Sequence, residues 1–163
     1  LDIGTGSGCI AIAAALYFEA STVVATDVSD EALEVARRNI EAHQVGDRVR
    51  TIRSDLFSQV TGAFDLSVSN PPYVDAEELA RMPQEYHHEP AMALGAGDDG
   101  LLFDRRIIDE ARSFLTPDGV LVLEVGASRE ALIDAYPSMP MIELELMYGG
   151  EGLFLIEAGH LPG

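Results

Sequence analysis

Leu1-Asp2-Ile3-Gly4-Thr5-Gly6-Ser7-Gly8 is the stretch that decides the fold. Its first three residues are typical of a strand that runs directly into a loop, and glycines at alternate positions let the backbone turn tightly and approach a ligand closely. A second strand ends at Asp27, whose carboxylate is placed to accept hydrogen bonds from two ribose hydroxyls. Loop, strand and acid together predict an α/β fold that binds a nucleoside. Because the chain opens inside the first strand, we expect a fragment with that strand truncated.

Helical and strand patterns alternate along the rest of the chain, which at 163 residues has the length of one domain. We expect helices at 9–18, 31–43, 101–115 and 128–135, and strands at 22–26, 49–53, 64–69, 120–125, 142–148 and 153–157. The last two strands flank Gly149-Gly150-Glu151-Gly152, a spacing that predicts a hairpin. The order of these helices and strands along the chain predicts a mostly parallel, doubly wound sheet whose last strand runs antiparallel. The ligand site is expected at the carboxyl ends of the early strands. Residues 73–100 lack periodicity and are predicted to form a long functional loop.

The order of the glycines narrows the choice of cofactor. Dinucleotide-binding loops favour G-x-G-x-x-G, where a helix N-terminus meets a pyrophosphate, whereas this loop reads D-x-G-x-G-x-G from Asp2 to Gly8. Asp2 at the mouth of the loop is expected to repel a pyrophosphate but to suit S-adenosylmethionine, which has no phosphate and carries an ammonium and a sulfonium charge. The alternative, a glycine-rich turn without function, does not account for the acid at position 27.

A weaker signal follows the third strand, at Ser54-Asp55-Leu56-Phe57. A carboxylate there can accept the exocyclic amine of an adenine, while Leu56 or Phe57 covers the face of the ring. Taken alone, the same residues are equally typical of a capped turn. Asp55 and Leu56 are therefore predicted to contact the cofactor, and the alternative is that they only form a capped turn.

Asn70-Pro71-Pro72-Tyr73, directly after the fourth strand, is the most specific feature of the sequence. An amide or aromatic-amine nitrogen has a delocalised lone pair, so methyl transfer to it requires that the nitrogen be held in line rather than ionised. The Asn70 side-chain oxygen and the Pro71 carbonyl can accept the two N–H bonds of an NH₂ group and stabilise the positive charge that develops. The prolines keep this presentation rigid, and Tyr73 offers a π-face to the forming cation. Asn-Pro-Pro alone is a turn signal, but beside a cofactor loop we interpret it as catalytic.

Charge separates classes of substrate. The chain carries 28 acidic and 10 basic residues, a net charge of −18, and every basic residue is arginine. A field of this sign repels phosphate backbones, so direct binding to nucleic acid is not expected. A basic protein substrate fits better, although a role in solubility explains the acidity equally well.

The composition also argues against membrane, secreted, disulfide-bonded and metal-binding classes of protein. No apolar run reaches the roughly 18 residues of a membrane span and no secretory leader is visible, so we expect a soluble, cytoplasmic protein. Cys9 is the only cysteine, which leaves no internal disulfide, and we interpret it as a packed apolar residue rather than a reactive thiol. No metal is expected, because metal-ligand spacing is absent from the histidines, which are His43, His87, His88 and His160.

Taken together, these motifs resemble the class I methyltransferases of the HemK/Prm family, the N5-glutamine protein methyltransferases. The resemblance extends over the whole chain and includes segments 85–90 and 97–101 and Leu123-Glu124-Val125-Gly126. It implies a Rossmann-like, seven-stranded, mostly parallel sheet that ends in an antiparallel hairpin. It implies that S-adenosylmethionine contacts Asp2, Gly4, Thr5, Gly6, Ser7, Gly8, Asp27, Asp55, Leu56 and Asn70. It also implies that the glutamine amide is gripped by Asn70, Pro71, Pro72, Tyr73, Glu89 and Pro90, of which Asn70, Pro71 and Tyr73 are the catalytic residues.

Two branches of this family act on different proteins, namely peptide-chain release factors and the third protein of the large ribosomal subunit (L three). Val74-Asp75-Ala76-Glu77, segment 83–90 and segment 149–154 are more similar to the ribosomal-protein branch, which is therefore the predicted one. Family members normally carry an N-terminal helical domain that helps to recognise the substrate. Residues 1–163 are predicted to be the catalytic domain without it, which leaves the substrate preference and activity of the fragment open.

Two functions of other kinds also stay open. Adenine-N6 methyltransferases of DNA or RNA use the same Asn-Pro-Pro-Tyr device on a flipped base, but they need a basic groove, which a net charge of −18 does not favour. A degenerate module that binds S-adenosylmethionine without catalysis is the other alternative, although Asn70 and Tyr73 are both present. The sequence makes no prediction of the oligomeric state.

Overall fold

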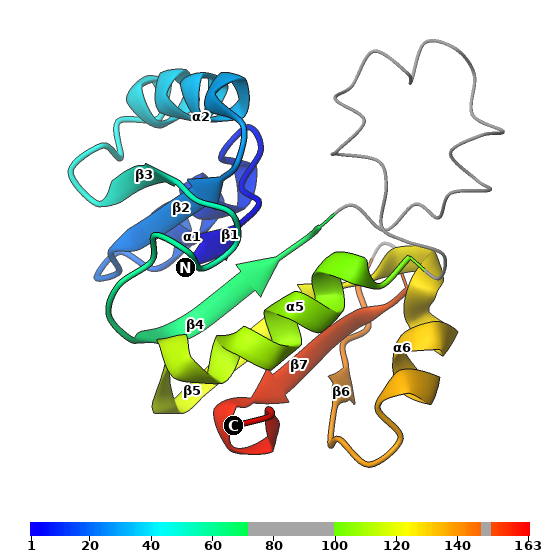
Figure 1. Ribbon diagram of the computed structural model, residues 1–163. Helices are drawn as coiled ribbons and strands as arrows, with labels where there is room; N and C mark the ends of the chain where they lie inside the picture. Colours follow the sequence, from blue (N-terminus) through cyan, green and yellow to red (C-terminus); the bar gives the residue numbers. More distant parts are fainter. Residues whose placement is uncertain (72–99, 148–150) are drawn as a thin grey trace, which may run out of the picture.

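The computed structural model describes residues 1–71, 100–147 and 151–163 (Figure 1). The strands are β1 (Asp2–Ile3), β2 (Val23–Asp27), β3 (Val49–Arg53), β4 (Phe64–Ser69), β5 (Leu115–Glu124), β6 (Ile142–Glu143) and β7 (Leu153–Glu157). The helices are α1 (Cys9–Tyr17), α2 (Asp30–Ala42), α5 (Leu102–Ala111) and α6 (Arg129–Ala135), with short 3₁₀ turns η2 (Arg112–Phe114), η3 (Gly126–Ser128) and η4 (Ala158–His160). The predicted loop at 73–100 lies outside the described residues except for Gly100, and so do Pro72, Tyr73, Glu89 and Pro90.

The described strands form one seven-stranded sheet in the order β3-β2-β1-β4-β5-β7-β6, which Figure 1 shows from blue and cyan at one end to red and orange at the other. In the part of the sheet with the order β3-β2-β1-β4-β5, every pair of neighbouring strands is parallel. The last strand in the chain, β7, runs antiparallel to both β5 and β6. The prediction of a mostly parallel sheet finished by an antiparallel hairpin is therefore confirmed.

Apolar side chains fill both faces of this sheet. In β2, Val24 belongs to a core cluster with Ile107 and Ile108 of α5, while Val23 packs in a second cluster with Ala11 and other residues of α1 and α2. Because successive side chains of a strand point to opposite faces, the two clusters lie on opposite sides of the sheet. Helices thus cover both faces, which is the doubly wound arrangement that the alternating pattern predicts.

Strands β3 and β4 have the predicted bounds, whereas the C-terminal region departs from prediction at three places. The strand predicted at 120–125 is β5, which begins five residues earlier, at Leu115, and ends at Glu124. The strand predicted at 142–148 is described up to residue 147, and within that part it pairs only at Ile142 and Glu143, with one further backbone bond from Leu144 N to Leu153 O. This strand lies at the sheet edge with most of its side chains exposed, so little burial supports it. The helix predicted to reach Leu115 ends at Ala111, because η2 turns the chain into β5 earlier.

Helix α1 also corrects one expectation. Its buried residues are Ala11, Ile12 and Ala15, which follow helical spacing, so Cys9 falls on the opposite, exposed side. The interpretation of Cys9 as a packed residue is therefore wrong.

No helix in the described part of the chain has the length and apolar character that crossing a membrane requires.

Arg48 satisfies the carbonyl groups at the C-terminal end of α1. Its Nη1 atom donates to the Ala15 carbonyl and lies 3.4 Å from the Phe18 oxygen and 3.3 Å from the Glu19 oxygen. The last carbonyls of a helix have no partner within the helix, and the helix dipole favours a cation beside them. Arg48 thereby ties the start of β3 to α1.

Replacing Arg48 by methionine is expected to lower the free energy of unfolding by about 1–2 kcal/mol, because the apolar side chain no longer donates to the Ala15 and Glu19 carbonyls. The Phe18 carbonyl still accepts from Ser21 N at 2.9 Å. Urea denaturation of the two proteins measures the difference. Arg50→Met is the matched control, since Arg50 is an exposed residue of the same strand and its replacement is expected to cost less than about 0.5 kcal/mol. Equal losses from both substitutions would contradict the assigned role.

Candidate functional site

The carboxyl ends of the first strands meet at one edge of the sheet. Ile3 pairs with Ser69 in the parallel register of β1 and β4, so Gly4 and Asn70 are the next residues of two neighbouring strands. Asp27 is the last residue of β2, which lies on the other side of β1. Neighbouring strands are about 4.8 Å apart. The glycine loop, the acid and Asn70 therefore lie together at this edge, as the sequence predicts.

The loop from Gly4 to Gly8 has one open and one packed end. Gly4 has a φ of +70°, and no heavy atom lies within 4 Å of where its Cβ would be. A ligand can therefore reach the backbone at this end. Gly8, with a φ of +81°, would place a Cβ 3.2 Å from the Cβ of Ala36 on α2. Its lack of a side chain lets the loop pack directly on that helix.

Asp2 lies beneath this loop and not at its mouth. The residue is 2% exposed, and its Oδ2 atom accepts hydrogen bonds from Thr5 Oγ1 at 2.5 Å and Ala11 N at 3.1 Å. Burial raises the pKa of the Asp2 carboxyl, and the two hydrogen bonds offset part of that rise. The expectation that Asp2 faces the ligand at the loop mouth is wrong. The side chain instead joins the loop to the first turn of α1.

Asn39 is a second anchor of the loop, which sequence reasoning missed. Its Nδ2 atom donates to the Ser7 carbonyl at 2.8 Å, across 32 residues. Ser7 itself is exposed, while Thr5 is buried and donates its backbone N–H to Thr26 O at 2.8 Å. No local pattern marks Asn39, because its role depends only on how α2 packs against the loop.

The Asp27 carboxylate is oriented by two backbone groups. Its Oδ2 atom accepts from Gly6 N and its Oδ1 atom from Ser29 N, both at 2.9 Å. A carboxylate oxygen has two lone pairs, so each atom retains one with which to accept a further hydrogen bond. Asp27 is partly exposed. It can therefore bind two hydroxyl groups without leaving its place in the loop.

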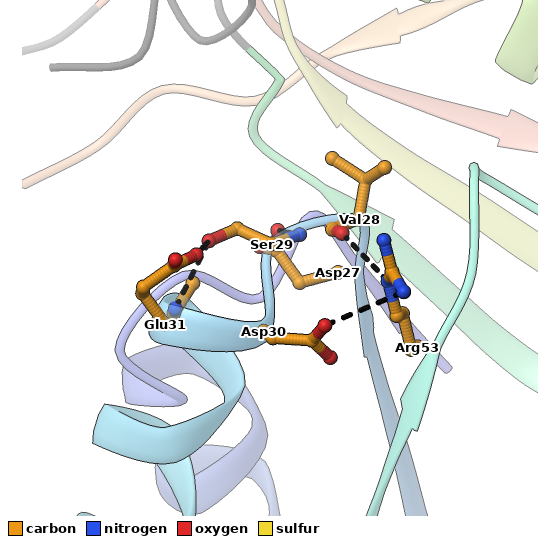
Figure 2. A network of polar contacts seen from close by, with 7 residues as sticks. Asp27, Val28, Ser29, Asp30, Glu31 and Arg53 are labelled. Atoms are coloured by element: carbon orange, nitrogen blue, oxygen red, sulfur yellow. Dashed lines mark hydrogen bonds and ion pairs between the residues drawn. The ribbon is translucent and has the colours of Figure 1, made fainter.

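Figure 2 shows how the turn that carries Asp27 is held. Arg53 at the end of β3 donates from Nε to the Val28 carbonyl at 3.2 Å, and its Nη1 atom lies 3.3 Å from Asp30 Oδ2. Ser29 caps α2 by accepting from Ala32 N at 3.2 Å. The side chain of Val28 stays 45% exposed beside Asp27. Val28 thus offers an apolar surface at the site, and no pattern in the sequence indicates this role.

The loop after β3 places Asp55 and Phe57 in opposite directions. Asp55 is exposed and its Oδ1 atom pairs with Arg106 Nη2 of α5 at 3.1 Å. Phe57 is 1% exposed and stacks on Phe114, with ring centroids 4.7 Å apart. The suggestion that Phe57 covers an adenine is therefore wrong, because its ring belongs to the core. Leu56, which is only partly buried, remains available for that contact.

Asn70 is an exposed residue between two buried ones. Ser69 is buried and donates from Oγ to the Ile3 carbonyl at 2.9 Å, and Pro71 is buried on the other side. The backbone around Asn70 is thus fixed while its side chain is accessible at the edge of the sheet. This arrangement suits a side chain that must present its amide oxygen to a ligand.

Two other features do not belong to this site. A hollow of about 800 Å³ is lined mainly by residues toward the amino ends of β2, β3 and β4, among them Thr22, Val49 and Phe64. Asp2 and Ala11 also line it, but no residue from Gly4 to Gly8 does. Within the described ranges, no cluster of three or more His, Cys, Asp or Glu side chains is placed to hold a metal ion.

Comparisons with known proteins give the family. Residues 1–131 match the model of the methyltransferase small domain. The ribosomal protein uL3 glutamine methyltransferase of Francisella tularensis subsp. tularensis is 52% identical over 157 residues, which are 96% of this chain and 50% of that protein. The protein of the same name from Neisseria meningitidis serogroup A is 47% identical over 163 residues, 100% of this chain and 54% of that protein. The chain thus spans about half the length of these curated relatives.

A solved structure supports the same assignment. The crystal structure of a methyltransferase from Pyrococcus furiosus superposes with a TM-score of 0.70 at 25% identity, over 96% of this chain and 73% of that one. The Rossmann-like class I methyltransferase fold that the resemblance implies is therefore confirmed. Since the family model also covers most of the sequence, the chain belongs to the methyltransferase small domain family.

Proposed function

We propose that this chain is the catalytic domain of an S-adenosylmethionine-dependent methyltransferase that modifies the side-chain amide nitrogen of a glutamine in the large-subunit ribosomal protein uL3. The observation that carries the proposal is the position of Asn70, which follows β4 directly beside the open glycine loop. The names of the relatives at 52% and 47% identity support uL3 as the proposed substrate. Because the proposed substrate is a ribosomal protein, we propose that the reaction takes place in the cytoplasm.

The residues at the edge of the sheet fit the cofactor. The free space at Gly4 lets the cofactor approach the loop backbone, and the lone pairs left on Asp27 suit the two ribose hydroxyls. Val28 and Leu56 offer apolar surface for the adenine. When bound, S-adenosylmethionine supplies an electrophilic methyl group on a sulfonium. Asp2 contributes indirectly by holding Thr5 and the start of α1.

Asn70 and Pro71 are proposed to grip the substrate amide. The Asn70 side-chain oxygen and the Pro71 carbonyl accept its two N–H bonds, which aims the nitrogen lone pair and stabilises the charge that develops there. The nitrogen becomes acidic only once it has been methylated, so this step needs no general base. Pro72, Tyr73, Glu89 and Pro90 remain predicted substrate contacts.

A direct test is the transfer of labelled methyl from S-adenosylmethionine by the full-length protein to purified uL3, release factor and DNA in parallel. Label on a glutamine of uL3 is expected. Label on the release factor would move the enzyme to the sister branch, and label on DNA would overturn the charge argument. Binding of the cofactor without label on any substrate would favour the non-catalytic module.

The cofactor part of the proposal predicts the effect of Asp27→Asn. The amide keeps one acceptor oxygen but loses the charge and the second acceptor, so the Kd for S-adenosylmethionine is expected to rise about tenfold. Isothermal titration measures it. Asp118→Asn is the control, because Asp118 is an exposed carboxylate of β5 that lies outside the site. Unchanged affinity in Asp27→Asn would rule out the ribose contact.

A further inference from the structure

The loop after β3 is fastened to the α5 region at two points of different chemistry. Phe57 stacks on Phe114 at an interplanar angle of 15°, and Asp55 pairs with Arg106 at 3.1 Å. In the apolar contact, Phe57 is buried and Phe114 partly buried, so this contact anchors the loop to the core. The polar contact is half exposed, with side-chain exposures of 58% for Asp55 and 41% for Arg106. Such a pair adds little to stability and instead fixes where the carboxylate points.

The backbone of this loop is held independently of Arg106. Ser54 N donates to the Asp27 carbonyl at 2.9 Å, and Ser54 Oγ donates to the Leu56 carbonyl at 2.7 Å. Leu56 has a φ of +45°, a conformation that costs a non-glycine residue about 1 kcal/mol and persists where the surroundings enforce it. Through Ser54, the loop is tied to the strand end that carries Asp27. Asp55 and Asp27 are therefore within reach of one nucleoside.

We propose that Arg106 is a positioning residue for the cofactor, holding the Asp55 carboxylate so that it accepts the exocyclic amine of the adenine. This inference rests on the proposed function. Arg106 engages Oδ1 through Nη2, and Oδ2 of the exposed Asp55 side chain is the atom that accepts the amine.

The experiment compares two ligands, S-adenosylhomocysteine and its deaminated analogue S-inosylhomocysteine, which carries a carbonyl where adenine has its amine. Isothermal titration is made with the full-length protein and with Arg106→Gln, Asp55→Asn and the double variant. Wild type is expected to prefer the adenine ligand. Arg106→Gln is expected to weaken binding of the adenine ligand about fivefold and to leave the inosine ligand unchanged or tighter.

Three comparisons distinguish a role of Arg106 in positioning Asp55 from a role in the stability of the whole protein. The double variant is expected to match Asp55→Asn, since Arg106 acts through Asp55. Arg106→Lys, which keeps the charge, is expected to restore part of the preference. Arg112→Gln is the control, because Arg112 donates to Leu161 O at 3.0 Å and its loss removes a structural contact away from Asp55.

The outcomes are distinct. An Arg106→Gln variant that weakens both ligands equally, or neither, overturns the inference while leaving the proposed function intact. Wild-type protein that binds neither ligand overturns the proposed function and this inference together. A loss of preference in Arg106→Gln that lysine partly restores supports the inference.

Discussion

Replacing Asn70 by alanine is expected to lower the rate of methyl transfer by about 100-fold to 1,000-fold and to leave the Kd for S-adenosylmethionine within about threefold. The variant loses the acceptor that aims the substrate nitrogen and stabilises its developing charge. Because Asn70 is exposed between buried Ser69 and Pro71, the fold should be unaffected. Single-turnover kinetics with labelled cofactor measure the rate, and isothermal titration measures the affinity.

Two further variants sharpen this result. Asn70→Asp keeps an acceptor oxygen at the same position and is expected to retain more activity than the alanine variant. Gln59→Ala removes an exposed amide outside the site and should leave the rate unchanged. An Asn70→Ala protein that transfers methyl at the wild-type rate would remove Asn70 from the catalytic residues.

Gly8→Ala is expected to lower the free energy of unfolding by about 3 kcal/mol. The new Cβ meets the Cβ and Cα of Ala36 at 3.2 and 3.3 Å, and Ala36 is fully buried, so α2 must shift. Overpacking of this kind costs about 1–3 kcal/mol, and the left-handed φ adds about 1–2 kcal/mol for an L-residue. Chemical denaturation monitored by circular dichroism gives the difference in unfolding free energy.

Gly4→Ala separates the two contributions. Gly4 also has a left-handed φ, but its Cβ would meet no atom within 4 Å, so only the conformational cost of about 1 kcal/mol is expected. The double variant Gly8→Ala/Ala36→Gly should recover part of the lost stability, because it removes the methyl group that the new Cβ contacts. Equal destabilisation by Gly4→Ala and Gly8→Ala would show that packing on Ala36 is unimportant.

The sequence was sufficient for the features that depend on local pattern and strand order. The bounds of β3 and β4 agree with prediction, because β-branched and alternating residues end at clear turn signals. The meeting of Gly4, Asp27 and Asn70 at one edge follows from the parallel sheet, since successive carboxyl ends point the same way. The position of the site could therefore be predicted before any side chain was placed.

Contacts between distant segments could not be predicted in the same way. The pairing of Asp55 with Arg106 spans 51 residues, and nothing local to either residue indicates it. Asp2 was expected to face the ligand, since the sequence does not reveal that its carboxylate is buried and that its Oδ2 atom accepts from Thr5 and Ala11. Phe57 was equally ambiguous until Phe114 was known to stack on it.

The interior position of β7 sets an order of assembly during synthesis. Residues 153–157 follow every other described strand in the chain, yet they insert between β5 and β6. Before residues 153–157 are made, the backbone N–H and C=O groups of β5 on that side have no β7 to pair with. A chain that lacks residues 153–157 therefore leaves this edge of β5 without its partner, and unpaired strand edges favour association with other chains.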